Sequence, residues 1–486
     1  MSPPRSDGLS TKSLEPQRFF DRALQRLRSA WRDLGVAAGT TSAGAPLSPD
    51  LSKDDLARVR AQMQNCLARK GGEVSARSQA AALGQAYLAL NEQGRRRFLR
   101  LLAEEFGTDR EAVDRAAADL LSVTDPAGRP AAEERLRQAL EPPRMQLLTQ
   151  FNGLPNGTKF LVDLRAELLE FVKQDPTLAP VEADLRRLLA SWFDVGFLEL
   201  RQISWHAPAS LLEKLIAYEA VHEIRGWDDL KNRLDSDRRC FAFFHPRMPD
   251  EPLIFVEVAL TVGMANSIQS LLDETAPVVD PATVDTAIFY SISNAQKGLV
   301  GISFGGFLIK RVVDVLSREV PRLKTFATLS PIPGFRRWLE QRLATDPELL
   351  RPDEAAVVVE AAGEAGTAEP AQALSVLLSR AVWHPDDPAA QALRRPLLRL
   401  AAVYLIREKR KNGMAIDPVA HFHLNNGARI ERLNWLGDVS PKGIAQSFGL
   451  MVNYLYRPDE IEANHETYRG EGGVAAAAAL RSLARG

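Results

Sequence analysis

One stretch of the chain, from Ala287 to Phe335, limits what the sequence can fold into more than any other. It opens with a β-rich apolar run, Ala287 to Ile292, and a loop rich in glycine follows. From Phe307 the apolar residues recur with a helical period, so we expect a helix directly after the glycines. The free N–H groups at the start of that helix would face the loop, which favours an anion as its ligand. A second apolar strand then leads to Ser330.

The glycine loop also has a purely structural interpretation. Gly298, Gly301, Gly305 and Gly306 can serve only to shape a tight connection between the strand and the helix. They complete neither a dinucleotide-binding pattern nor a phosphate-binding P-loop. Spacing alone therefore leaves a phosphate site and a tight turn equally open.

Length and charge narrow the class of protein. A chain of 486 residues is too long for one ordinary core and indicates two or more domains. Its 61 basic and 62 acidic side chains nearly cancel, so no bulk field attracts nucleic acid or an anionic membrane. No apolar run is long enough to span a bilayer. Any polyanion that the protein binds must therefore be small and held by a local basic pocket.

The cysteines and the two ends of the chain bear on its location. Cys66 and Cys240 lie far apart and form neither a disulfide framework nor a metal-spaced cluster, which fits a reducing compartment. The basic, amphipathic segment from Phe19 to Leu34 contains aspartates, which favour an ordinary surface helix over an organellar presequence. The last residues, Leu483 to Gly486, are not a peroxisomal signal. Together these features predict a cytoplasmic protein.

The chain divides into two parts by its periodicity. Helical patterns dominate residues 1–190 and predict an all-helical amino-terminal domain, in the form of a bundle. Within it, Ser52 and Asp55 have the spacing of a capping box, and the helical pattern that opens at Asn91 ends before Gly107.

Residues 191–486 carry mixed signals, so the chain as a whole is predicted to be α+β. Cys240 to Phe244 and Leu253 to Leu260 have the pattern of strands, and the strands before the glycine loop are expected to be largely antiparallel. From about 343 to 410 the chain is rich in alanine and leucine, which predicts a helical insertion.

A serine and two histidines are candidates for chemistry. Ser330 opens the segment SPIPGF, and pattern alone favours a turn or capping serine before proline there. His421 and His423 alternate with Phe422 like residues of a strand, so the two imidazoles are expected to share a face. Since no carboxylate or cysteine nearby completes a ligand set, no metal site is predicted, and one histidine is expected to do acid–base work.

The residues after the histidines add a turn and two aromatic side chains. Asn425, Asn426 and Gly427 predict a hairpin turn. Tyr454 and Tyr456 lie in the apolar run MVNYLY and are interpreted as core aromatics whose hydroxyls need hydrogen-bond partners.

Several separate motifs together resemble those of the malonyl-CoA decarboxylase family. They are GISFGGFLIKRVV, SPIPGF, HFHLNNGA, RLNWLGDVSPKG and SFGLMVNYLY. The resemblance runs from about Trp192 to Tyr468, and the helical region before it fits the amino-terminal domain of that family. It implies a catalytic domain with the fold of the Gcn5-related acetyltransferases, in which a glycine-rich turn between strand and helix holds the pyrophosphate of CoA. That expectation agrees with an anion site at the glycine loop.

The resemblance also assigns residues to roles. It places the active-site serine at Ser330, the active-site histidine at His423 and an active-site tyrosine at Tyr456. It does not implicate His421, because relatives can carry asparagine there. The turn that binds malonyl-CoA falls on Val300, Gly301, Ile302, Ser303, Phe304, Gly305 and Gly306. Some relatives have glutamate where this chain has Ser303, so a role for that carboxylate does not carry over.

The activity implied by the resemblance is the conversion of malonyl-CoA to acetyl-CoA and carbon dioxide, which is the work of a carboxy-lyase. CoA is then part of the substrate, and no separate cofactor is expected. An acyltransferase on the same fold and a non-catalytic CoA-binding scaffold remain as alternatives. A helical domain of this kind suits self-association, so a homodimer or homotetramer is expected.

Overall fold

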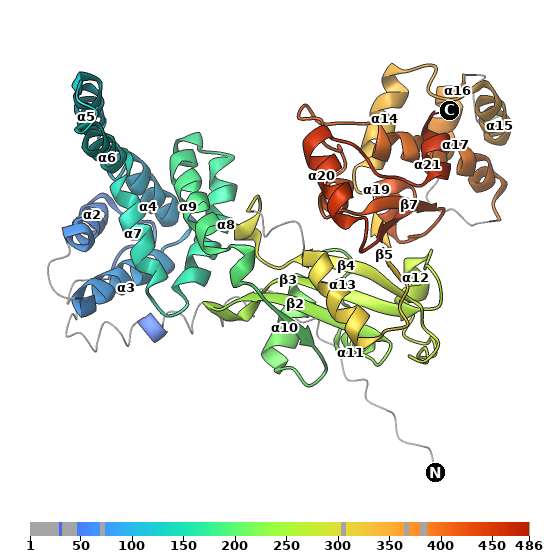
Figure 1. Ribbon diagram of the computed structural model, residues 1–486, viewed down its shortest axis with the longest axis horizontal. Helices are drawn as coiled ribbons and strands as arrows, with labels where there is room; N and C mark the ends of the chain where they lie inside the picture. The colour runs from blue at the N-terminus through green and yellow to red at the C-terminus, as the bar shows by residue number, and fades with distance from the viewer. Residues whose placement is uncertain are drawn as a thin grey trace, which may run out of the picture. The chain divides into compact units, whose positions relative to one another are not determined.

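The computed structural model describes residues 29–31, 46–68, 73–302, 308–363, 369–379 and 386–485 (Figure 1). The chain forms two compact units, and neither is one continuous stretch. The first comprises residues 1–199, 244–253 and 295–303, and the second comprises 200–243, 254–294 and 304–486. A continuous domain boundary near residue 190 therefore stays a prediction. Each unit is described by itself below.

Helices dominate the first unit, as predicted. Most of the helices form a run before residue 193: α2 (Lys53–Ala68), α3 (Glu73–Ala89), α4 (Glu92–Glu105), α5 (Arg110–Ser122), α6 (Arg129–Leu140), α7 (Pro143–Asn152), α8 (Gly157–Val172), η1 (Pro176–Leu178) and α9 (Ala179–Trp192). The unit also holds two short 3₁₀ turns, η2 (Val195–Phe197) and η3 (Lys297–Leu299), and residues 244–253, where strand β2 (Arg238–His245) turns into β3 (Met248–Thr261). Several helices begin where a side chain satisfies their free N–H groups, as Asn91 does for Gly94 N and Asp109 for Ala112 N.

Aromatic side chains fill the core of the first unit. The ring of Phe160, on α8, makes edge-on contacts with Trp31 at 4.9 Å and with Tyr87 at 5.8 Å between ring centroids. Tyr87 in turn packs edge-on against Phe98 at 5.1 Å. Helix α8 is thus the central element of this unit, because its apolar side packs against rings from other helices.

A mixed sheet organises the second unit. Its strands are β1 (Glu199–Ile203), β2 (Arg238–His245), β3 (Met248–Thr261), β4 (Thr286–Asn294), β5 (Thr325–Thr328), β6 (Ser330–Pro331), β7 (Arg429–Asn434) and β8 (Met451–Tyr456). Their order is β1-β2-β3-β4-β5-β8-β6, and β7 also pairs with β8. Strand β3 is antiparallel to β4, β4 is parallel to β5, and β8 is antiparallel to β5, β6 and β7. The prediction of an α+β chain with a largely antiparallel sheet is confirmed.

The described part of the second unit contains twelve helices. They are α10 (Ala209–Tyr218), α11 (Trp227–Asn232), α12 (Ile268–Leu271), α13 (Leu308–Glu319), α14 (Phe335–Thr345), α15 (Pro352–Ala362), α16 (Pro370–Leu378), α17 (Pro388–Ile406), α18 (Pro418–Asn425), α19 (Pro441–Ser447), α20 (Ile461–Glu471) and α21 (Ala478–Arg485). Among the described parts of the chain, no helix is long and apolar enough to cross a membrane.

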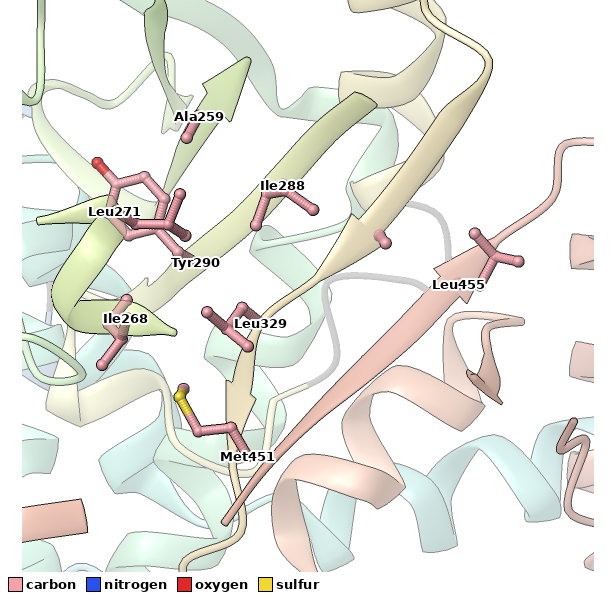
Figure 2. Packing of buried hydrophobic residues seen from close by; sticks show 9 residues of the cluster. Ala259, Ile268, Leu271, Ile288, Tyr290, Leu329, Met451 and Leu455 are labelled. Atoms are coloured by element: carbon pink, nitrogen blue, oxygen red, sulfur yellow. The ribbon is translucent and has the colours of Figure 1, made fainter. Parts of the chain in front are cut away.

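One face of the sheet carries an apolar cluster. Figure 2 shows Ile288 and Tyr290 of β4 beside Leu329 and Met451, and all of these side chains are buried. Because side chains alternate along a strand, the neighbours of Leu329, namely Thr328 and Ser330, lie toward the opposite face. The sheet thus separates its apolar core from the face that carries the candidate serine.

The histidine segment is a helix, so the predicted strand and hairpin turn are wrong. Asp417 caps α18 by accepting from Val419 N and Ala420 N, both at 2.9 Å, and Pro418 occupies the first turn. Three alternating residues are too few to distinguish the period of a strand from that of a helix. The cap at Asp417 favours the helix. Gly427, with φ of 80°, follows the helix end instead of forming a hairpin.

Candidate active site

Ser330 lies at an interruption between two short strands. Strand β5 ends at Thr328, and Ser330 begins β6, which pairs with Val452 of β8. Before the interruption, Ala327 pairs with Leu455 of the same strand. Ser330 is buried, so its hydroxyl is directed into the second unit. It lies in a strand, whereas pattern alone favoured a turn or capping serine.

His423 lies between the Ser330 hydroxyl and a tyrosine. Its Nε2 atom is 3.2 Å from Ser330 Oγ, and its Nδ1 atom is 2.8 Å from the Tyr456 hydroxyl. The imidazole also stacks on the ring of Tyr454, with centroids 4.4 Å apart and planes at 23°. Only 3% of His423 is exposed to solvent. The three residues that the resemblance assigned to the active site therefore form one hydrogen-bonded chain in the second unit.

His421 has a different environment on the same helix. Residues two positions apart on a helix are separated by about 200° around its axis, so the two imidazoles cannot share a face. His421 Nδ1 lies 2.7 Å from the hydroxyl of Tyr468, which accepts from Ala415 N. His421 thus belongs to a structural contact away from Ser330.

Burial fixes the protonation of the central pair. It lowers the pKa of His423 to about 3 and raises the pKa of Tyr456 well above its usual value. At neutral pH the histidine is therefore a neutral imidazole, and the tyrosine keeps its proton. The two residues thus form a chain of neutral donors and acceptors, in which neither partner carries a charge at rest.

The sequence interpretation missed Thr328, which contacts Ser330 directly. Thr328 Oγ1 accepts a hydrogen bond from the Ser330 hydroxyl at 2.8 Å and another from Tyr454 N at 3.1 Å. Its carbonyl oxygen accepts from Asn453 Nδ2 at 2.6 Å. Thr328 precedes Ser330 by two residues in an extended segment, so the strand period alone places both hydroxyls on one face.

Asp417 was also missed, although it supports the helix that carries His423. Besides capping α18, its Oδ2 atom accepts from Gly334 N at 3.4 Å and from the Tyr404 hydroxyl at 3.3 Å. Burial raises the pKa of this carboxyl group. The signal in the sequence was the Asp-Pro pair, which is typical of a helix start. Asp417 ties α14 and α17 to the helix of the candidate histidine.

The predicted CoA turn falls in the first unit where it is described. Val300 is 61% exposed, Gly301 has φ of 77°, and Ile302 is buried. A Cβ atom on Gly298 would lie 1.7 Å from Val162 O, so this glycine serves close packing against α8. The predicted binding residues Ser303, Phe304, Gly305 and Gly306 lie outside the described residues.

A buried arginine holds the start of that turn. Arg165, on α8, donates through Nη1 to Gly298 O at 2.5 Å and to Val300 O at 2.9 Å. Its Nη2 atom is 2.8 Å from Glu182 Oε1, so the guanidinium is fixed by an ion pair. No feature of the local sequence marked Arg165, because the two carbonyl groups that it binds follow more than 130 residues later.

Both parts of the chain match known domains. Residues 196–486 match the profile of the malonyl-CoA decarboxylase C-terminal domain, and residues 106–193 match that of the malonyl-CoA decarboxylase N-terminal domain. The chain therefore belongs to the malonyl-CoA decarboxylase family, as its motifs predicted.

Individual relatives agree with this assignment. The chain is 40% identical over 398 residues to mitochondrial malonyl-CoA decarboxylase of Rattus norvegicus, covering 79% of this chain and 80% of the relative. It is 39% identical over 397 residues to that of Anser anser anser, covering 78% of each. The crystal structure of malonyl-CoA decarboxylase from Rhodopseudomonas palustris has a TM-score of 0.80 at 44% identity, covering 88% of this chain and 99% of that one. That from Agrobacterium vitis has a TM-score of 0.78 at 44% identity, with the same coverage.

The relatives contradict the predicted cytoplasmic location. The malonyl-CoA decarboxylases of Anser anser anser, Rattus norvegicus and Mus musculus, at 39% to 40% identity, are all mitochondrial proteins by name. The prediction failed because the lack of a peroxisomal signal does not exclude a mitochondrial one. The segment from Phe19 to Leu34, interpreted as a surface helix, lies largely outside the described residues.

Proposed function

We propose that this protein decarboxylates malonyl-CoA to acetyl-CoA and carbon dioxide. The observation that carries the proposal is the buried chain of Ser330, His423 and Tyr456, with His423 Nε2 3.2 Å from Ser330 Oγ and Nδ1 2.8 Å from the Tyr456 hydroxyl. Family membership supports it, since the relatives named above are malonyl-CoA decarboxylases.

The chemistry of the substrate explains why such a site suffices. When the bond to the carboxylate breaks, its electron pair stays on the methylene carbon and is taken up by the thioester carbonyl as an enolate. The substrate thus supplies its own electron sink, and we propose that no separate cofactor takes part. The protein must stabilise the developing oxyanion and deliver one proton to carbon. Each oriented donor to the oxyanion typically contributes about 3 kcal/mol to lowering the barrier.

We assign these tasks to the chain of buried residues. His423 gives its Nε2 proton to the nascent enolate of acetyl-CoA, which is a stronger base than the imidazolate left behind. Tyr456, which lies at Nδ1 of the same ring, is placed to return a proton to the imidazolate, and a proton from water then restores the tyrosine. Ser330 hydrogen-bonds either the malonyl group or, as in this structure, His423, and sets its orientation. Backbone N–H groups of Val300 to Gly306 hold the CoA diphosphate, as the motif of the family implies.

Incubation with malonyl-CoA alone tests the proposal. Carbon dioxide and acetyl-CoA in equal amounts, with no acceptor present, are the expected products. Turnover only after an amine is added would instead identify an acyltransferase. Tight CoA binding without turnover of any acyl-CoA would identify a binding module. Either of the last two results would refute the proposed decarboxylation.

The dependence of activity on pH follows from the burial of His423. Its pKa of about 3 keeps the imidazole neutral, so kcat is expected to show no inflection near the ordinary histidine value of about 6.5. The unfolded chain takes up that proton first, so the free energy of unfolding falls as the pH drops from about 6.5 toward 3. Saturating turnover and urea midpoints, each measured from about pH 5 to 8, check both statements.

The variant His421→Asn shows whether an inflection of kcat comes from the neighbouring histidine or from His423. An inflection of kcat near pH 6.5 that persists in His421→Asn would contradict a neutral His423.

We also propose that the protein self-associates through its helical region. Helices α5 and α6 pack on each other and extend away from the other helices of the first unit in Figure 1. Each buries a single alanine, Ala116 or Ala132, whereas Leu121 is 87% and Leu140 51% exposed. Exposed leucines on two helices that bury so little of their own surface favour a contact with another copy. We expect light scattering to give a multiple of the 53.6 kDa chain mass, and Leu121→Glu to lower it. A wild-type mass of one chain would refute self-association.

A further inference from the structure

The hydroxyl group of Thr328 has an unusual place in the sheet. In a regular antiparallel ladder between β5 and β8, Tyr454 N would donate to a backbone carbonyl group. Here Tyr454 N donates to the side chain of Thr328, and the Thr328 carbonyl oxygen accepts from the Asn453 amide. The threonine side chain thus replaces a backbone hydrogen bond where the strand is interrupted. This substitution holds Thr328 Oγ1 at a fixed position behind Ser330.

The position of Thr328 determines where the Ser330 proton points. Ser330 Oγ has the geometry of a donor to Thr328 Oγ1, at 2.8 Å. A serine hydroxyl has one proton and two lone pairs, so toward its other neighbour Ser330 can only accept. That neighbour is His423 Nε2, at 3.2 Å, which must then be the donor.

The rest of the chain follows by counting protons. A neutral imidazole carries a single N–H, so a proton on Nε2 leaves Nδ1 as an acceptor. Nδ1 accepts from the Tyr456 hydroxyl, which keeps its proton. Every hydrogen bond in the chain therefore runs the same way, from Tyr456 through His423 and Ser330 to Thr328.

We propose that Thr328 is a positioning residue that holds the proton of His423 on Nε2, the nitrogen that faces Ser330. Its effect on turnover rests on the proposed function, in which His423 Nε2 gives that proton to the enolate. Without the Thr328 hydroxyl, the Ser330 hydroxyl turns and donates to Nε2. The imidazole proton then moves to Nδ1, and the nitrogen beside Ser330 has no proton to give.

Two substitutions of Thr328 separate this role from packing. Thr328→Val keeps the branched shape and removes the hydroxyl, whereas Thr328→Ser keeps the hydroxyl and removes a methyl group. We expect Thr328→Val to lower kcat for malonyl-CoA by about 10- to 100-fold, with KM changed by less than about threefold. Thr328→Ser is expected to stay within about threefold of wild type in both parameters. Wild-type kcat in Thr328→Val, or equal losses in both variants, would overturn the proposal.

The tautomer of His423 provides a readout that does not depend on activity. In protein with ¹⁵N-labelled histidine, the ring nitrogen shifts distinguish Nε2–H from Nδ1–H, and His423→Asn identifies the signal. We expect Nε2–H in the wild type and in Thr328→Ser, and Nδ1–H in Thr328→Val. An Nδ1–H wild type, or Nε2–H retained in Thr328→Val, would overturn the proposal.

The two readouts also distinguish this inference from the proposed function. If the wild type does not turn over malonyl-CoA but shows the expected tautomers, the proposed function fails and the role of Thr328 stands. If Thr328→Val does not fold, the proposal is tested by the ¹⁵N signal of His423 in the wild type. A proton on Nε2 supports the proposal, and a proton on Nδ1 refutes it.

Discussion

His423→Asn is expected to lower kcat for malonyl-CoA decarboxylation by about 1,000-fold, the largest effect on activity that we predict. Asparagine is small enough for the site and carries no charge, so the fold is expected to survive. It cannot pass a proton from Tyr456 toward Ser330, however, because an amide neither gains nor loses a proton at neutral pH. The decisive measurement is acetyl-CoA formation at saturating malonyl-CoA.

His421→Asn is the matched control for this variant. It makes the same chemical change two residues earlier on α18, where the side chain contacts Tyr468 instead of Ser330. We expect His421→Asn to keep kcat within about threefold of wild type. If the two variants lost activity equally, the effect would come from a disturbed helix, and His423 would have no special part in proton transfer.

Arg233→Met is expected to cause the largest loss of stability, about 3–5 kcal/mol. The guanidinium of Arg233 is buried between two buried carboxyl groups, with 2.8 Å to Asp229 and 3.0 Å to Glu257. It also donates to the carbonyl oxygens of His222 and Glu223. Methionine fills a similar volume but leaves all of these acceptors without their donor. The urea midpoint of the variant measures the loss.

Arg225→Met is the control for Arg233→Met. Arg225 also pairs with acidic residues, Glu274 and Asp229, but 69% of its side chain is exposed. Water can replace those contacts, so a loss of no more than about 0.5 kcal/mol is expected. Equal losses in the two variants would contradict the importance of burial.

The ionisation of Glu257 makes the stability loss of Arg233→Met depend on pH. Burial and the nearby Glu219 carboxylate raise the pKa of Glu257 to about 8, and Arg233 opposes that rise. A raised pKa contributes stability at low pH that is lost as the pH rises from about 4.5 through 8. Without Arg233 the pKa rises further, so the loss in Arg233→Met is expected to be larger at pH 9 than at pH 6.

The parts of the fold that the sequence predicted are those specified by local chemistry. The helix predicted to open at Asn91 does begin there as α4, with the Asn91 side chain as its cap, because a cap acts over three or four residues. The apolar runs around Cys240, Leu253 and Ala287 are strands because an extended run is specified by its own residues.

The errors and omissions arise where distant segments decide the structure. The HFH segment has too few residues to reveal its period, and the Asp417 cap that makes it helical also depends on contacts with Gly334 and Tyr404. Thr328 gains its importance from Tyr454, which lies more than a hundred residues further along the chain. Only the resemblance to the motifs of a known family selected Ser330, His423 and Tyr456 as active-site residues. The local pattern favoured a turn or capping role for Ser330.

The contact of Arg165 with the turn after β4 bears on how this protein can be cut or recombined. In sequence, the turn belongs with the carboxy-terminal motifs. A fragment that starts at residue 191 would carry it but would leave Gly298 O and Val300 O without the guanidinium that now binds them. A chimera that joins helices of one family member to the carboxy-terminal part of another must keep Arg165 and Glu182 compatible with the incoming turn. The segment that must be exchanged together with this turn therefore begins in α8.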